Sequence, residues 1–134
     1  MSKSLIQVAN QSQQNVAVNS IISLGSVQRR YGCNCRLSGN GIEVDGQGYY
    51  KVDASVSVAP TAVGAVTVAL FSNGVQVPGA IAYDSVSTAA NPTNLSIVAT
   101  IRQGCCCDSA DNLTLVLLEG AGVVENVSMR VEKS

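Results

Sequence analysis

Five cysteines are the side chains of this chain best suited to metal binding or covalent chemistry. They form two groups, Cys33-Asn34-Cys35 and the run Cys105-Cys106-Cys107. Thiolates bind soft ions such as zinc, and paired thiols form disulfides within or between chains. Neither spacing is the two-residue gap of a zinc knuckle, the chain has no histidine, and an odd count excludes complete pairing within one chain. Three interpretations stay open: small buried or loop thiols, disulfides in or between subunits, and a metal site.

Few residues suggest catalysis. Without histidine, a serine or cysteine nucleophile lacks its commonest base, and no arrangement in the sequence would activate Lys51. Asp108 and Asp111 flank a loop as a carboxylate pair would, but aspartates that cap backbone amides in a solvated turn explain the pattern better. The sequence therefore predicts neither an enzyme nor a bound cofactor.

Basic residues are concentrated only at Arg29, Arg30 and Arg36. Salt bridges across a subunit boundary, or a solvated loop, explain them more simply than binding of a sugar or phosphate. Only 13% of the 134 residues are charged, and the net charge is -1. The chain thus has no basic surface for nucleic acid or for an anionic membrane, and no acidic tail.

The composition also bears on how the chain is organised. Hydrophobic residues make up 46% of it, enough for the core of one domain over residues 1–134. A surface this poor in charge is suited to burial against copies of itself, which favours an oligomer. The apolar runs are far shorter than the roughly 20 residues that span a bilayer, and the first residues show no signal peptide. We therefore expect a soluble protein made in the cytoplasm, with no membrane insertion.

The elements that must position these side chains are strands. The clearest is 48–58, which begins at a glycine and alternates with a period of two until Pro60. One of its faces is apolar, with Tyr50, Val52, Ala54, Val56 and Val58. The other is mixed, with Tyr49, Lys51, Asp53, Ser55 and Ser57. This pattern predicts a strand with one buried face and one face toward solvent or another subunit.

Similar alternation predicts further strands over 5–9, 16–24, 42–44, 66–70, 75–77 with 81–83, 95–101, 113–117 and 127–131. Asn73-Gly74 predicts a tight hairpin, because this pair readily adopts the positive φ angles of a two-residue turn. No segment keeps a helical apolar period. The sequence therefore predicts an all-β fold of about eight to ten short antiparallel strands, as in a sandwich, jelly roll or barrel.

The order of these motifs resembles the trimeric jelly roll shared by the complement q-subcomponent globular head and tumour necrosis factor. The resemblance rests on four stretches: Gly41-Ile-Glu-Val44, Gly48-Tyr-Tyr-Lys-Val52, the hairpin from Leu70 to Val77, and Asn112-Leu-Thr-Leu-Val with the closing Val127 to Val131. It implies a jelly-roll β-sandwich whose inner sheet faces a threefold axis. Tyr49, Lys51, Asp53 and Ser55 would then lie at the trimer interface. A trimer would also bring together three copies of each cysteine group if these lie near the axis.

The resemblance implies a function as well. Versions without a collagen repeat look like phage head or tail decoration proteins and the tips of spore-surface filaments. We therefore expect a non-enzymatic homotrimer at the surface of a virion or particle, with a larger viral or cell-surface assembly as its partner. Recognition would lie on loops 33–40, 82–93 and 105–111, where Arg36, Tyr83 and Asp108 are candidate binding residues. The alternatives are an adhesin module that binds a glycan or surface receptor, and a metal-binding or redox-responsive trimer built on the cysteines.

Overall fold

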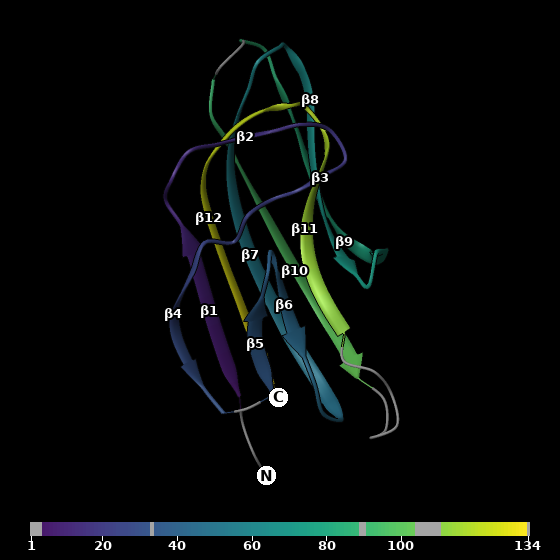
Figure 1. The fold of residues 1–134 in the computed structure, drawn as a ribbon. Helices are drawn as coiled ribbons and strands as arrows, with labels where there is room; N and C mark the ends of the chain where they lie inside the picture. The colour runs from purple at the N-terminus through teal and green to yellow at the C-terminus, as the bar shows by residue number, and fades with distance from the viewer. Residues whose placement is uncertain (1–3, 33, 89–90, 104–110, 134) are drawn as a thin grey trace.

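Two antiparallel sheets of six strands each form the described part of the chain (Figure 1). The computed structural model describes all residues except 1–3, 33, 89–90, 104–110 and 134. Sheet A runs in the order β10 (Thr93–Gln103), β7 (Gly48–Pro60), β12 (Gly122–Lys133), β1 (Leu5–Asn10), β4 (Ser26–Tyr31), and β2 (Gln14–Val16) also pairs with β12. Sheet B runs in the order β5 (Cys35–Ser38), β6 (Gly41–Val44), β11 (Asp111–Glu119), β8 (Gly64–Ser72), β9 (Val75–Val86), and β3 (Ser20–Ile21) also pairs with β11.

The core lies between the two sheets and follows the period-two pattern. All five apolar residues predicted to face inward from β7 are buried, and Tyr50 and Val52 are fully so. The neighbouring strands contribute the same kind of row, with Leu95, Ile97 and Ile101 from β10 and Val127, Met129 and Val131 from β12. Sheet B supplies the facing layer from Val66, Val68, Leu70, Leu113, Leu115 and Leu117. The predicted jelly-roll sandwich is confirmed, and strand 48–58 lies inside sheet A, between the edge strand β10 and β12.

The segment predicted as one strand over 16–24 is instead two short strands. β2 pairs with β12 in sheet A, and β3 pairs with β11 in sheet B. The chain changes sheets between them, and Asn19 there has a φ of 66° and donates its backbone N–H to the Leu117 carbonyl at 2.6 Å. This division, together with β4 and β5, which the sequence did not predict, raises the count to twelve strands within the described residues, against the predicted eight to ten.

Two residues predicted on loops lie on strands. Arg36 is in β5, where its backbone pairs with Glu43 across a hairpin that turns at Gly39 and Asn40. Tyr83 is in β9 opposite Thr67. β9 continues through Pro78-Gly79 because the pairing register with β8 shifts there. The third candidate, Asp108, lies outside the described residues. So does the rest of the predicted loop 105–111, except Asp111, which begins β11.

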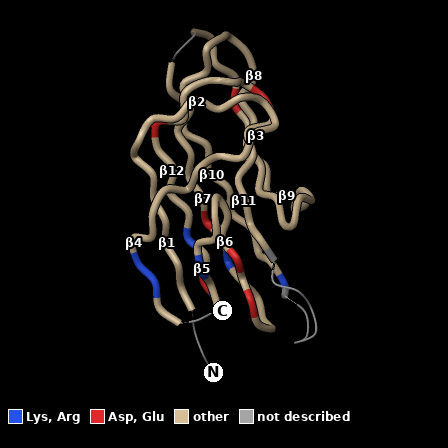
Figure 2. Tube along the Cα trace, viewed as in Figure 1, with Lys and Arg blue, Asp and Glu red and all other residues tan. Residues whose placement is uncertain are grey.

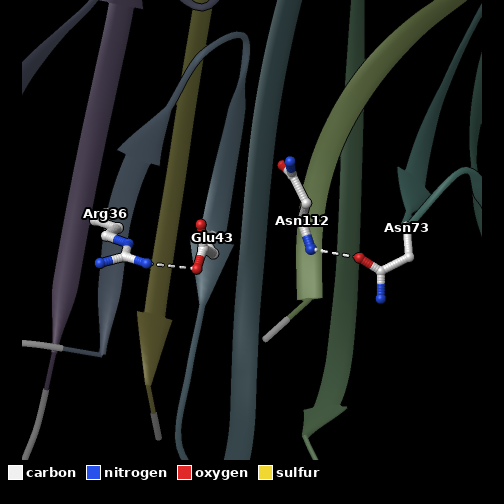
Figure 3. Close-up of polar contacts among 4 residues, drawn as sticks. All are labelled: Arg36, Glu43, Asn73 and Asn112. Carbon is white, nitrogen blue, oxygen red and sulfur yellow. Dashed lines mark hydrogen bonds and ion pairs between the residues drawn. The ribbon is translucent and has the colours of Figure 1, made fainter. Parts of the chain in front are cut away.

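The predicted hairpin at Asn73-Gly74 is confirmed. Asn73 has a φ of 52° and Gly74 a φ of 82°, as a tight turn with two left-handed residues requires. The turn is also tied to β11. Asn112 donates its backbone N–H to Asn73 Oδ1 at 2.9 Å (Figure 3), and Asn73 donates its own N–H to the Asn112 carbonyl at 3.0 Å. No helix in the described part of the chain is long and apolar enough to cross a membrane.

Candidate subunit interface

The outer face of sheet A, which points away from the core, is the candidate site. β7 places the four predicted residues Tyr49, Lys51, Asp53 and Ser55 on this face, and none of them is buried. The pairing register then fixes their neighbours. Lys51 lies between Thr100 of β10 and Glu132 of β12, and Asp53 lies between Val98 and Arg130.

An ion pair crosses the middle of this face. Arg130 Nη2 lies 2.7 Å from Asp53 Oδ2, and each side chain is about half exposed. The hydrogen bond to the Asp53 carboxylate, together with its charge, raises the pKa of Arg130. An exposed pair of this kind contributes little to folding. Its effect is to hold two opposite charges against each other, so that neither is presented alone to a neighbouring molecule.

A shallow depression of about 410 Å³ lies beside this ion pair. Its floor is formed by short side chains at the same level of three strands, Ser96, Ser55 and Ser128, which pair across β10, β7 and β12. Val98, Asp53, Arg130 and Gln7 form its rim. Val98 is 74% exposed, unusual for a valine at the centre of a strand. The face is therefore hollow in the middle and carries an exposed apolar side chain at the edge of the hollow.

Two serine hydroxyls of this face, those of Ser55 and Ser57, are hydrogen-bonded within the sheet. Ser55 and Ser57 both donate to Oδ1 of Asn94, at 3.0 and 3.2 Å. A hydroxyl that keeps its hydrogen bond can be covered without the usual cost of burying an unpaired polar group. This polar surface is consequently suited to contact with protein as well as with water.

The size of the face is compatible with a stable contact. The three longest strands of sheet A have 11 to 13 residues. At about 3.3 Å per residue and about 4.8 Å between strands, and with the shorter β1 and β4 added, the face measures roughly 700 Å². Stable interfaces bury about 800 Å² on each partner. The outer face of sheet A therefore supplies most of the area that one subunit contact needs.

Cys35 is the only one of the five cysteines among the described residues. Its side chain is 1% exposed and belongs to the core. Burial raises the pKa of its thiol to about 11, although the charges of Arg30 and Lys133 act in the opposite direction. The thiolate that a metal ion requires is thus disfavoured at Cys35. Cys33, Cys105, Cys106 and Cys107 lie outside the described residues, within which no group of three potential metal ligands comes together.

The basic residues do not form one cluster. Arg36 lies on sheet B, where its Nη2 is 2.7 Å from Glu43 Oε1 (Figure 3), and this hydrogen bond raises its pKa. This pair forms within one hairpin, whereas the sequence suggested bridges across a subunit boundary. Arg29 and Arg30 lie on β4 at the edge of sheet A. Lys and Arg residues gather in the half of the molecule where β1 begins and β12 ends (Figure 2).

A polar network that the sequence did not reveal closes this same end. Asn34 accepts a hydrogen bond from Ser4 Oγ at 2.7 Å and donates through Nδ2 to the Asp45 carbonyl at 2.6 Å. The buried Tyr50 hydroxyl lies 2.8 Å from the Asp45 carbonyl and 2.7 Å from that of Gly46. The partners are up to 30 residues apart. Tyr50 is close in sequence to Asp45 and Gly46, but the contacts of Asn34 join residues 30 and 11 positions apart. No local motif could therefore have predicted the whole network.

Comparison with known proteins identifies the fold. No protein-family model matches the sequence, and no curated protein is significantly similar to it. Among solved structures, Eiger TNF from S. frugiperda matches with a TM-score of 0.72 and 10% identity, over 98% of this chain and 91% of that one. The globular domain of zebrafish complement 1qA matches with a TM-score of 0.70 and 11% identity, over 94% of each chain.

A viral structure belongs to the same set. PRD1 vertex protein P5 matches with a TM-score of 0.67 and 13% identity, over 98% of this chain and 96% of that one. These similarities confirm the resemblance drawn from the sequence, because the chain has the tumour necrosis factor-like jelly-roll fold over nearly its whole length. At such low identities the similarity concerns the fold alone.

Proposed function

We propose that the protein is a non-enzymatic structural component that assembles as a homotrimer through the outer face of sheet A. The observation that carries this proposal is the character of that face: broad, hollow at the centre, with the Asp53–Arg130 ion pair, the hydrogen-bonded Ser55 and Ser57, and the exposed Val98. In a threefold ring this face of one copy meets a different surface of the next copy. The expectation from the fold is that this sheet surrounds the axis.

The finer assignment is a decoration or fibre-tip protein of a phage or prophage particle. The similarity of fold to a vertex protein supports it. The arrangement of the chain supports it too, because Ser4 and Lys133 are hydrogen-bonded neighbours at one end of the sandwich. Attachment through either end of the chain would leave the opposite end, with the β7–β8 and β11–β12 connections, facing outward (Figure 1).

An adhesin role has weaker support. Glycan binding commonly uses an aromatic platform. Tyr83 is 76% exposed on β9 of sheet B, and Tyr31 is 51% exposed on β4 of sheet A. These two tyrosines lie on different sheets and do not form one platform. We therefore place the recognition of a larger assembly, rather than of a glycan, first.

Molar mass in solution tests the proposal. Light scattering coupled to gel filtration should give three times the 13.8 kDa of one chain. Ser96→Arg, which fills the depression, should yield monomers, while the matched control Ser38→Arg, at an exposed position of β5 on the other sheet, should remain trimeric. A wild-type monomer would refute the trimer. The same measurement with a chelator and with a reductant tests the cysteine alternatives. Loss of the trimer with the chelator would show that a metal ion holds the subunits together, and loss with the reductant would show that disulfides do.

A further inference from the structure

The free edge of β4 is the second surface that suggests a partner. β4 ends sheet A, and among the described residues it pairs only with β1. All six of its residues are exposed. On such an edge, alternate backbone N–H and C=O groups point away from the sheet and can pair with another extended chain. β4 contains no proline to block this pairing.

The side chains of β4 determine which extended segment could pair with its free edge. Arg29 is paired with Gln7 and Arg30 with Ile6, so the two guanidinium groups leave opposite faces of the strand. Arg30 donates through Nε to the Cys35 carbonyl at 2.9 Å, which fixes its position. Neighbouring residues of an added strand also point to opposite faces. Two adjacent carboxylates would therefore each meet one arginine, with the half-exposed Tyr31 and Val27 beside them.

No two acidic residues are adjacent anywhere in the sequence, so a second copy of this chain does not supply such a strand. If β4 paired antiparallel with β4 of a second copy about its centre, the four arginines would be close neighbours and would repel. β10, at the other edge of sheet A, contains no acidic residue. β9 contains only Asp84, which is already hydrogen-bonded to Thr93 Oγ1 at 2.6 Å and to the Ser85 N–H. The partner must be another protein.

From these observations we infer that β4 is a docking edge for an extended acidic segment of a different protein, which adds one strand to sheet A. Main-chain hydrogen bonds would give the affinity, and the arginine pair would select for adjacent carboxylates. This inference does not require the trimer, but Arg29 lies on the same face of sheet A as Gln7. Light scattering must therefore show that Arg29→Glu keeps the molar mass of the wild type before its binding is compared.

A synthetic probe tests it. The probe is a fluorescein-labelled eight-residue peptide of alternating threonine and valine with two adjacent glutamates at its centre, titrated with the full-length protein at 150 mM salt, where distant charges are screened. We expect saturable anisotropy, with amide shift changes in NMR spectra confined to β4 and its neighbours. Arg29→Glu should weaken binding at least tenfold. The charge-matched control Arg102→Glu, at the opposite edge of the sheet, should change it less than twofold.

Two altered peptides separate strand addition from simple charge attraction. N-methylation of alternate residues removes half of the backbone donors and should weaken binding at least tenfold, although the charge is unchanged. Replacement of both glutamates by glutamine should do the same while the backbone is unchanged. Absence of binding, or equal binding of either altered peptide, would overturn the inference and leave the arginines as a charge that keeps the edge from aggregating.

Discussion

The free energy of unfolding of this protein should fall at alkaline pH because of Tyr50. The variant Tyr50→Phe should therefore be less stable than the wild type near neutral pH and more stable than it at high pH. Its ring is fully buried beneath sheet A. Burial, and then the nearby Cys35 and Asp45, raise the pKa of Tyr50 from 10.0 to about 12, although the hydrogen bond with Asn34 acts in the opposite direction. The native protein therefore retains this proton at a pH where the unfolded chain has lost it.

The sign and size of the effect follow from this difference. Below pH 10 the hydroxyl is protonated in both states, and the native state keeps its full stability. As the pH rises from 10 to 12, ionisation stabilises only the unfolded chain, so the free energy of unfolding decreases. A rise of the pKa from 10.0 to about 12 corresponds to about 3 kcal/mol, since each pKa unit is about 1.4 kcal/mol. About 2 kcal/mol of this should be lost by pH 11.5.

Tyr50→Phe removes both the titration and the hydrogen bond to the Asp45 and Gly46 carbonyls. At pH 8 the variant should be less stable than the wild type by about 1 kcal/mol, the usual net contribution of one hydrogen bond. At pH 11.5 it should be more stable by a similar amount. Cys35, whose pKa is raised to about 11, also titrates in this range in both proteins, and only its interaction with the Tyr50 hydroxyl differs between them.

Urea unfolding followed by circular dichroism at pH 8 and pH 11.5 measures this crossover, at one fixed protein concentration because assembly adds to stability. Tyr83→Phe is the matched control, since this side chain is 76% exposed, and it should follow the wild-type pH profile. If Tyr50→Phe is less stable than the wild type by the same amount at both pH values, the proposed role of the buried hydroxyl is refuted.

Three further predictions concern the core, a turn and the surface. Leu115→Ala should reduce the free energy of unfolding by about 3 kcal/mol in urea titrations, because Leu115 is fully buried between the sheets. Gly25→Ala should prevent soluble expression or lower the melting temperature by more than about 4 °C, which is roughly what 1 kcal/mol does in a domain of this size. Gly25 has a φ of 79°, and an added Cβ would collide with the Ala9 carbonyl oxygen. Arg36→Ala should leave the melting temperature unchanged, because its ion pair with Glu43 is exposed.

The core could be predicted from the sequence because its signal is local. In β7 every second side chain from Tyr50 to Val58 is apolar, and burial on one face is the arrangement that separates them from water. The Asn73-Gly74 turn is equally local, since its two positive φ angles depend on two adjacent residues. Where the chain leaves one sheet for the other, as between Val16 and Ser20, apolar alternation continues across the crossing, and the sequence pattern predicts one strand where there are two.

Only part of the candidate site could be predicted from the sequence, because alternation within one strand is local whereas the register between strands is not. β7 alone shows that Asp53 and Ser55 share a face, and the sequence predicted this. Which residues of β10 and β12 lie beside them depends on register, and β12 shifts its register against β7 between Val124 and Asn126. Arg130, the partner of Asp53, lies 77 residues further along the chain. No spacing within the sequence links the two.

The two faces of sheet A also differ in how well their roles can be inferred from residue type. Apolar side chains that recur at every second position, as Val52 does in β7 and Val131 in β12, indicate the core. Serine, aspartate and lysine are compatible with water and with a polar protein contact alike. What distinguishes an interface here is therefore arrangement rather than composition: hydroxyls paired to Asn94, an arginine held against Asp53, and Val98 left exposed beside a hollow. These three features support the proposed subunit contact on this face.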